Sequence, residues 1–295
     1  MRIVSPYDVT PAELVSTSVV NEYANWASGT YNTGDRAIYD NRVHEAVATT
    51  TDRPDVGALS DPPTWVYVGW SNQYRMFRDG IDSRSTSVGD IDITLEFSGI
   101  VGTVALLGVS GVSARLVAET VADGVIYDKT IQLINIGVQD WWEYYFLEYG
   151  ASEDAIFDDV TPFTGVTLSL TIAAASASTE TSIGRVLAGL SKYIGVALYG
   201  TSISFQDYSI KERDGFGNLI LVKRRTIKEV KYDVHVNTSG VSDIVRVLKT
   251  VAAVPTLYIG EDSMPSTIVF GVYTDVSQGI TTPSVSELTI TVEEF

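Results

Sequence analysis

Cysteine is absent from the 295-residue chain, and histidine occurs only twice. Without cysteine the protein has no disulfide bond and no thiolate ligand for a metal. The two histidines, His44 and His235, lie far apart in the sequence, and neither has the neighbours of a metal site or a catalytic triad. We therefore expect structural, partly buried histidines, and we expect no metal and no other cofactor.

A long apolar run and an excess of positive charge are also missing. No uncharged apolar run reaches the ~18 residues of a transmembrane helix, and residues 1–6 show no secretory signal. Lys and Arg total 20 against 37 Asp and Glu, which gives a net charge of −17. Because this charge repels phosphate groups, we expect neither nucleic-acid binding nor membrane insertion. The charge favours a soluble protein whose partners carry basic patches.

Motifs of common catalytic sites are missing too. No phosphate-binding glycine loop, no Gly-x-Ser-x-Gly turn and no Asp-x-Asp-x-Asp-Gly calcium loop is present. The acidic clusters at 153–154 and 158–159 are interpreted as solvated turns. The alternative is a glycan-degrading enzyme that uses carboxylates such as Asp154 and Asp158. No acid–base pair can be singled out, so we predict that the chain is not an enzyme.

Short strand-like segments separated by turn residues dominate the chain. Residues 92–97 and 166–172 alternate apolar and polar side chains, which is the pattern of a half-buried strand. Residues 203–213 and 219–225 flank the turn Asp214-Gly215-Phe216-Gly217-Asn218 and predict a hairpin. The cations in Val222-Lys-Arg-Arg225 are interpreted as a solvated sheet edge, or alternatively as a patch that docks a partner.

Two helices are predicted. Thr10-Pro11-Ala-Glu13 has the pattern of a capping box and predicts a short helix over 11–17. Apolar residues between 244 and 251 follow one helical face, and Pro255 ends that helix. Residues 75–90 are polar and are interpreted as a connector, whereas the aromatic residues 141–146 predict a strand.

The fold class is therefore mainly β. It comprises a small N-terminal β module, a central antiparallel β-sandwich or jelly roll, and a C-terminal small α+β unit. The predicted domains are residues 1–75 (an N-terminal arm and the small module), 76–228 (the sandwich) and 229–295 (the α+β unit).

The small N-terminal module is rich in tryptophan and tyrosine, and a hairpin is predicted around Asp40-Asn41-Arg42. In so small a unit, large aromatic side chains either form the core or present a platform on which sugar rings stack. We favour the core and retain the platform as the alternative. The possible glycan-binding or partner-binding aromatic residues are Trp26, Tyr39, Trp65 and Trp70.

The spacing of aromatic and turn residues carries a first resemblance. Trp26, Gly34-Asp35 and Ile38-Tyr39, followed by the Asn41-x-Val43 hairpin and Trp65, resemble the small chitin-binding-type carbohydrate-binding modules of families 5 and 12. That resemblance implies a β module with sugar-binding aromatic residues. His44 stands where the family pattern has a tyrosine, so one platform residue of the family is absent here.

Segments spread over nearly the full chain carry a second resemblance. They include Asp61-Pro62-Pro63-Thr64-Trp65, Met76-Phe77-x-Asp79, Asp207-Tyr208-Ser209, Leu257-Tyr258-Ile259-Gly260 and Val269-Phe270-Gly271. They resemble tail-associated structural proteins of tailed bacteriophages. The resemblance implies a virion protein of the tail or baseplate, a multi-copy adaptor or attachment protein that joins tail parts or fibres. The implied partners are other virion tail proteins and copies of itself. The alternative is a receptor-recognition protein that binds host-surface glycan.

Overall fold

The computed structural model describes residues 1–78, 80–135, 150–213, 215–261, 264–280 and 282–295. Strand content is 52% against 10% helix, in large curled antiparallel sheets, so the mainly β prediction is confirmed. The strand predicted over 141–146 lies outside the described residues.

The chain forms two compact units. The large unit is Tyr7–Ala188, and the terminal unit combines Met1–Pro6 with Gly189–Phe295. This division differs from the domains expected at 1–75, 76–228 and 229–295. The reason is that strand β1 (Arg2–Pro6) pairs with β22 (Thr256–Ile259), which brings the two ends of the sequence into one sheet.

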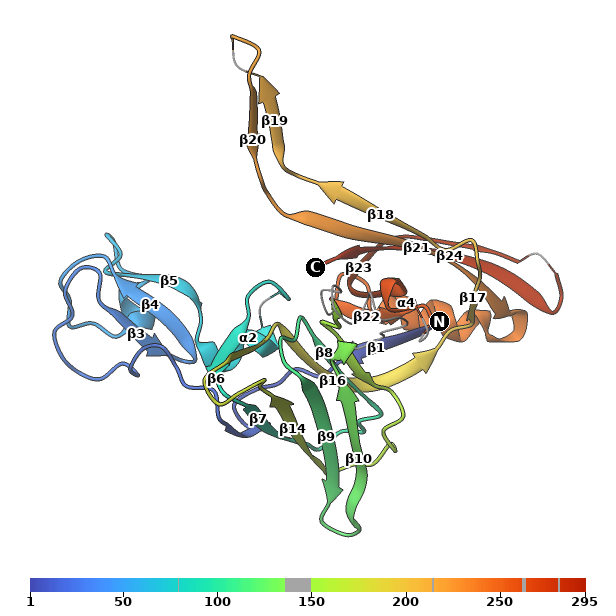
Figure 1. Cartoon of the computed structure of the whole chain (residues 1–295), viewed down its shortest axis with the longest axis horizontal. Coiled ribbons are helices and arrows are strands. Elements are labelled where there is room, and N and C mark those ends of the chain that lie inside the picture. Colours follow the sequence, from blue (N-terminus) through green and yellow to red (C-terminus); the bar gives the residue numbers. More distant parts are fainter. Residues whose placement is uncertain (79, 136–149, 214, 262–263, 281) are drawn as a thin grey trace, which may run out of the picture. The chain divides into compact units, whose positions relative to one another are not determined.

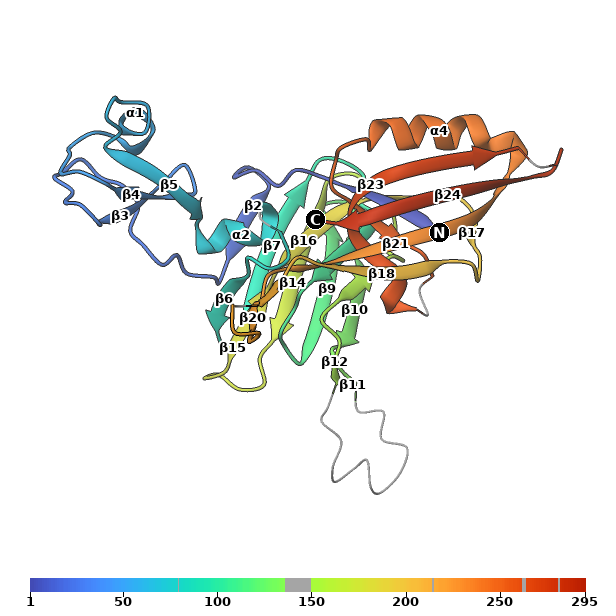
Figure 2. The same cartoon turned by 90° about the horizontal axis from the view of Figure 1, so that it is seen from above.

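A five-stranded antiparallel sheet forms the centre of the large unit (Figure 2). Its order is β10 (Gly124–Gln132), β9 (Ser113–Thr120), β14 (Val166–Ala173), β7 (Ile91–Phe97) and β2 (Leu14–Thr17). Strand β7 alternates as expected, because Ile91, Ile93, Leu95 and Phe97 are buried and the residues between them are not. Further pairs are β8 (Thr103–Leu107) with β13 (Ala155–Phe157), β6 (Ser85–Val88) with β15 (Glu180–Ile183), and β11 (Ile134–Asn135) with β12 (Gly150–Ala151).

Two secondary-structure predictions in this unit are wrong. The capping contact at Thr10 forms, since its backbone N–H donates to Glu13 Oε2 at 2.8 Å, but strand β2 follows instead of a helix. Leu14 and Thr17 pair with β7, and this tertiary pairing overrides the local helix signal. The segment interpreted as a connector over 75–90 contains most of helix α2 (Asn72–Arg78) and all of β6, because Met76 and Phe77 are buried in the core.

The small aromatic-rich module lies within the large unit. It has a three-stranded sheet of β3 (Arg36–Tyr39), β4 (Arg42–Ala46) and β5 (Trp65–Trp70), with a short helix α1 (Pro54–Gly57) before β5. The predicted hairpin is confirmed: β3 and β4 pair, and Asp40 and Asn41 both take the positive φ of a two-residue turn.

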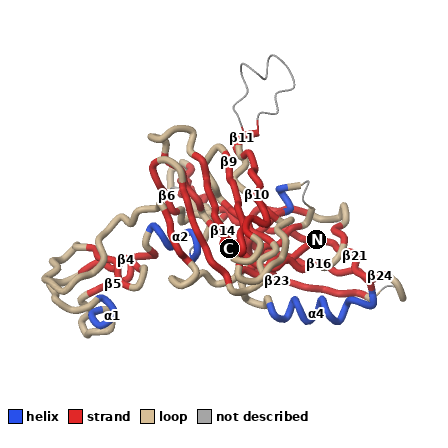
Figure 3. Tube along the Cα trace, turned by 90° about the horizontal axis from the view of Figure 1, so that it is seen from below, coloured by secondary structure: helices blue, strands red, loops and turns tan. Residues whose placement is uncertain are grey.

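The terminal unit is an antiparallel sheet with one long helix beside it (Figure 3). Its order is β16 (Arg185–Tyr193), β1, β22, β23 (Ile268–Gly279), β24 (Val285–Glu294), β21 (Thr226–Asn237) and β17 (Val196–Ala197). Strand β18 (Ser202–Asp207) also pairs with β21. The predicted helix is confirmed as α4 (Val241–Thr250), and its Leu248 packs into the core of the sheet. Two 3-10 turns, Thr238–Gly240 and Pro265–Thr267, complete the unit.

Candidate functional site

Trp65, one of the four expected binding aromatics, is a core residue. Its side chain is 0% exposed, and its indole N–H donates to the carbonyl oxygen of Asp52 at 3.0 Å. The ring packs edge-on against Tyr31, with 5.1 Å between centroids. A residue enclosed on all sides cannot stack on a sugar, so Trp65 holds the module together.

Trp26 and Tyr39 form a second pair at the border of this core. Their ring centroids lie 6.2 Å apart in an edge-to-face arrangement. Trp26 is partly buried against Ala37, Ala46 and Trp65. These contacts assign Trp26 mainly to the core as well, with part of each ring reaching solvent.

Trp70 differs from the other three because it lies in a cleft. Arg42 lies over its ring at 4.7 Å and Arg78 at 5.6 Å, and Arg75 Nε donates to its carbonyl oxygen at 3.1 Å. The cleft has a volume of about 560 Å³, and its lining includes Trp70, Tyr67, Tyr23, Arg36 and Arg75. Of the four expected residues, Trp70 is the one that lines this cleft, and its ring also packs against the hydrophobic core of the large unit.

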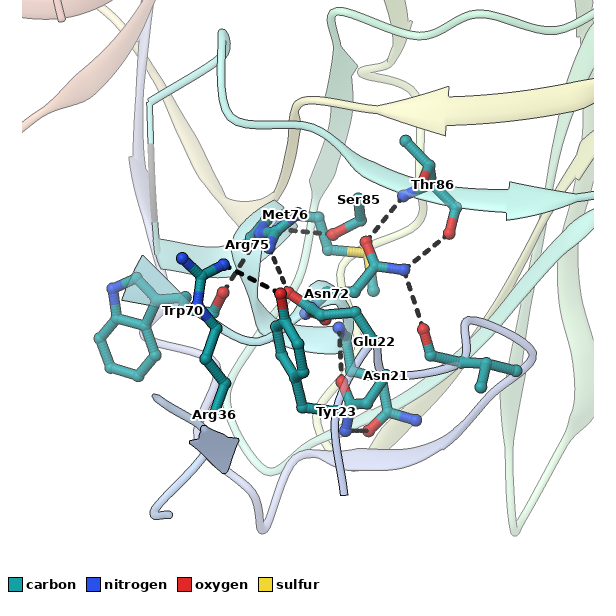
Figure 4. Close-up of polar contacts among 12 residues, drawn as sticks. Asn21, Glu22, Tyr23, Arg36, Trp70, Asn72, Arg75, Met76, Ser85 and Thr86 are labelled. Carbon is teal, nitrogen blue, oxygen red and sulfur yellow. Dashed lines mark hydrogen bonds and ion pairs between the residues drawn. The ribbon is translucent and has the colours of Figure 1, made fainter. Parts of the chain in front are cut away.

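A polar network fixes the floor of this cleft (Figure 4). Glu22 accepts from the backbone N–H of Asn72 at 2.8 Å and forms an ion pair with Arg75. The Asn72 side chain donates to the carbonyls of Val20 at 2.9 Å and Thr86 at 2.8 Å, and it accepts from the Thr86 N–H at 3.0 Å. Asn72 therefore fastens helix α2 to two separate segments, which gives the cleft a rigid base.

Arg36 forms one wall of the cleft and is already partnered. It donates to the Tyr23 hydroxyl at 2.9 Å and to Glu45 Oε2 at 2.7 Å. The hydrogen bonds that Arg36 donates to Tyr23 and Glu45 raise the pKa of Arg36 above its ordinary value. The wall thus combines ring faces with an oriented guanidinium, groups that can bind a sugar or another polar ligand.

The two histidines occupy structural positions. His44 is buried, lies 6.0 Å from the Tyr67 ring, and has its pKa lowered by burial and by the nearby Arg42 charge. His235 is more exposed, with Nε2 at 4.0 Å from Glu287 on the neighbouring strand β24.

The acidic residues considered for catalysis take part in local contacts. Asp154 accepts from the Gly108 N–H at 3.2 Å. Asp159 accepts from the Tyr127 hydroxyl at 2.6 Å and from Lys129 at 2.8 Å, and these bonds lower the pKa of Asp159. A general acid needs a raised pKa, so Asp159 is unsuited to that role.

Within the described ranges no three His, Cys, Asp or Glu side chains gather in a way that could hold a metal ion. No described helix has the length and apolarity needed to span a membrane.

A second candidate site is a hairpin that extends from the terminal unit. Strands β19 (Ile210–Arg213) and β20 (Leu219–Val222) pair with each other and continue the ribbon formed by β18 and β21 (Figure 1). We name residues 208–225 the hairpin arm. The hairpin predicted in this region is confirmed, although the ribbon divides into two ladders at residues 208–209.

Apolar side chains of the hairpin arm lie in solvent. Every residue of β20 is exposed, with Leu219 at 53% and Leu221 at 62%, and Tyr208 is 50% exposed. Contacts in the bend hold the backbone: Arg224 N–H donates to Ser209 Oγ at 3.0 Å, and Lys211 pairs with Asp207 at 2.6 Å. The arm is therefore an ordered, exposed apolar surface of the kind that marks interaction sites.

Comparison with known proteins returned no match among protein-family models, curated proteins or solved structures.

Proposed function

We propose that this chain is a structural virion protein of a phage tail or baseplate, present in several copies, which joins tail parts or fibres. The observation that carries the proposal is the hairpin arm, whose apolar strand β20 (Leu219–Val222) is exposed along its whole length. A row of such side chains on an ordered ribbon is what an assembly protein needs for contact with a neighbour.

Three further observations support an assembly role. The sequence segments quoted above resemble tail-associated structural proteins. Trp65, Trp26 and Tyr31, half of the aromatic residues in the small module, form its core or pack against it. The carboxylates with described contacts are engaged in local hydrogen bonds and ion pairs, not gathered around a reactive centre.

Mass spectrometry of purified phage particles tests this proposal. The chain should be present in the virion at several copies relative to a component of known stoichiometry. Its absence from intact particles, together with its presence in the lysate, would contradict the proposal.

A second function is favoured by one observation, the cleft around Trp70. In this alternative the chain recognises host-surface glycan, with the sugar bound beside Trp70 and Tyr67 and its hydroxyls facing Arg75 and Glu22. Fluorescence titration with cell-wall oligosaccharides tests it. The Trp70→Ala variant should lose the response, whereas Trp26→Phe should retain it. An intact chain that gives no response at millimolar sugar would overturn the alternative.

A further inference from the structure

The hairpin arm is incomplete as a piece of β structure. Its two strands, of four residues each, pair only with each other, so each leaves one edge of backbone groups without a neighbouring strand in the described chain. An isolated two-stranded ribbon is marginally stable in water, and a third strand or a packing partner stabilises it. The legs 208–213 and 219–225 have six and seven residues, and each spans about 20 Å of extended chain.

The charge of the hairpin arm is opposite to that of the rest of the protein. Residues 208–225 contain five Lys and Arg against two Asp and Glu, a net charge of +3. The large unit contains nine Lys and Arg against twenty-five Asp and Glu, a net charge of −16. The remainder of the terminal unit has six basic and ten acidic residues, a net charge of −4. The large unit of another copy of this same chain therefore carries a net charge opposite in sign to that of the arm.

The large unit also has an apolar strand edge, at β5. This strand is the last of the three-stranded sheet, and its consecutive residues Val66, Tyr67 and Val68 are 45–48% exposed. Residues 26–70 around it carry three basic and six acidic residues, a net charge of −3. The exposed sequence of β20, Leu219-Ile-Leu-Val222, resembles this edge in apolar character.

We infer that the hairpin arm of one copy docks on the large unit of a second copy, with β20 added as a strand beside β5. Backbone hydrogen bonds and apolar contacts hold the added strand, and Lys223 and Arg224 face the acidic module. Because the two surfaces differ, the contact is head-to-tail and builds a ring or a filament of copies. This inference rests on the proposed multi-copy structural function and specifies its self-contact.

The absence of cysteine makes a direct test possible. Leu221→Cys, labelled with a photoreactive maleimide, is mixed with an equal amount of unlabelled chain grown in ¹⁵N medium, and is then irradiated. Mass spectrometry should find the Leu221 position joined to ¹⁵N peptides that contain β5. The matched control is Val254→Cys, an exposed apolar position of the terminal unit outside the arm, which should give no such product.

A second pair of measurements examines the electrostatic part. The first measurement uses the Leu221→Cys chain with the added substitutions Lys223→Glu and Arg224→Glu, which should lose the cross-linked product. The second uses the Leu221→Cys chain at about 1 M salt, where the screening length is about 3 Å and the product should also be lost. Circular dichroism checks that the variants remain folded.

Three results would overturn the inference: no product between copies, links only between two arms, or links away from β5. Any of these results would contradict the inference. If mass spectrometry still finds the chain in virions, the proposed function is unaffected.

Discussion

The small aromatic module and the hairpin arm are both β-hairpin structures rich in apolar side chains, yet they place those side chains in opposite ways. In the module, Trp65 is enclosed and Tyr31 packs on it. In the arm, Leu219, Leu221 and Val222 lie in solvent. An apolar side chain in the module therefore stabilises the single copy, whereas one in the arm is available for contact with a neighbour.

The side chains are enclosed in the module and exposed in the arm because the module has a third strand and a covering loop, which the described arm lacks. Three strands, with helix α1 and the loop before β5 folded over one face, can enclose a large indole ring. The two strands of the hairpin arm have no second layer packed on them in the described chain, so both faces of the ribbon remain exposed to solvent. This comparison predicts that substitutions in the two regions separate stability from assembly.

Trp65→Ala is expected to have the largest effect. Removing this enclosed ring leaves a cavity and should cost about 3–5 kcal/mol of unfolding free energy in the module. Hydrogen exchange of residues 26–70 would measure the loss. Trp65→Phe, which keeps much of the ring volume, should lose clearly less. Equal protection in the Trp65→Ala and unsubstituted proteins would contradict the assignment of Trp65 to the core.

Gly57→Ala should have the next largest effect. A Cβ atom at residue 57 would overlap the Thr64 hydroxyl and the Trp65 ring, so the ring must shift, at a cost of about 1–3 kcal/mol. Urea unfolding monitored by hydrogen exchange would measure this loss of unfolding free energy. The control is Gly69→Ala in β5, where nothing lies within 4 Å of the added atom. Similar behaviour of the two variants would show that residue 57 is not tightly packed.

A pH effect is expected at His44. Burial and Arg42 lower the pKa of His44, although Asp55 and Asp40 oppose this shift, so the folded module favours the neutral ring. The resulting stability is fully present above the ordinary histidine pKa of about 6.5 and is lost as the pH falls through the lower folded value. His44→Gln should show less loss of module stability below pH 6.5 than the unsubstituted protein. Parallel stability curves for the two proteins would refute this account.

Leu221→Ser should have the smallest effect on stability. The side chain is exposed, so the unfolding free energy of the single copy should change by no more than about 0.5 kcal/mol. Denaturant unfolding at low protein concentration would measure it. A loss as large as that of Gly57→Ala would mean that the arm packs within its own copy.

Much of the fold was predictable because local signals coincide with the final contacts. The alternation of 92–97, the turn at Asp40-Asn41 and the apolar helical face between 244 and 251 each specify an element without help from distant residues. Helix α4 ends at Thr250, before Pro255. The helix predicted over 11–17 fails because pairing of Leu14 and Thr17 with β7 is a long-range contact.

The candidate sites were less predictable because they also depend on contacts between residues far apart in the sequence. The aromatic cluster was visible in the sequence, but which ring is enclosed depends on how the loop before β5 folds. The cleft joins Glu22 to Arg75 and Val20 to Asn72 across about fifty residues, and no spacing rule connects such partners. The arm is exposed because no third strand lies beside it in the part of the chain that the structure describes, and no local sequence pattern encodes this.

Sedimentation velocity over a range of protein concentrations tests the central claim most directly, namely that the hairpin arm makes this chain a multi-copy assembly protein. The intact chain should form larger species as its concentration rises. The Leu219→Ser, Leu221→Ser double variant should remain a single copy with unchanged unfolding. Identical sedimentation of the two proteins at every concentration would contradict the account.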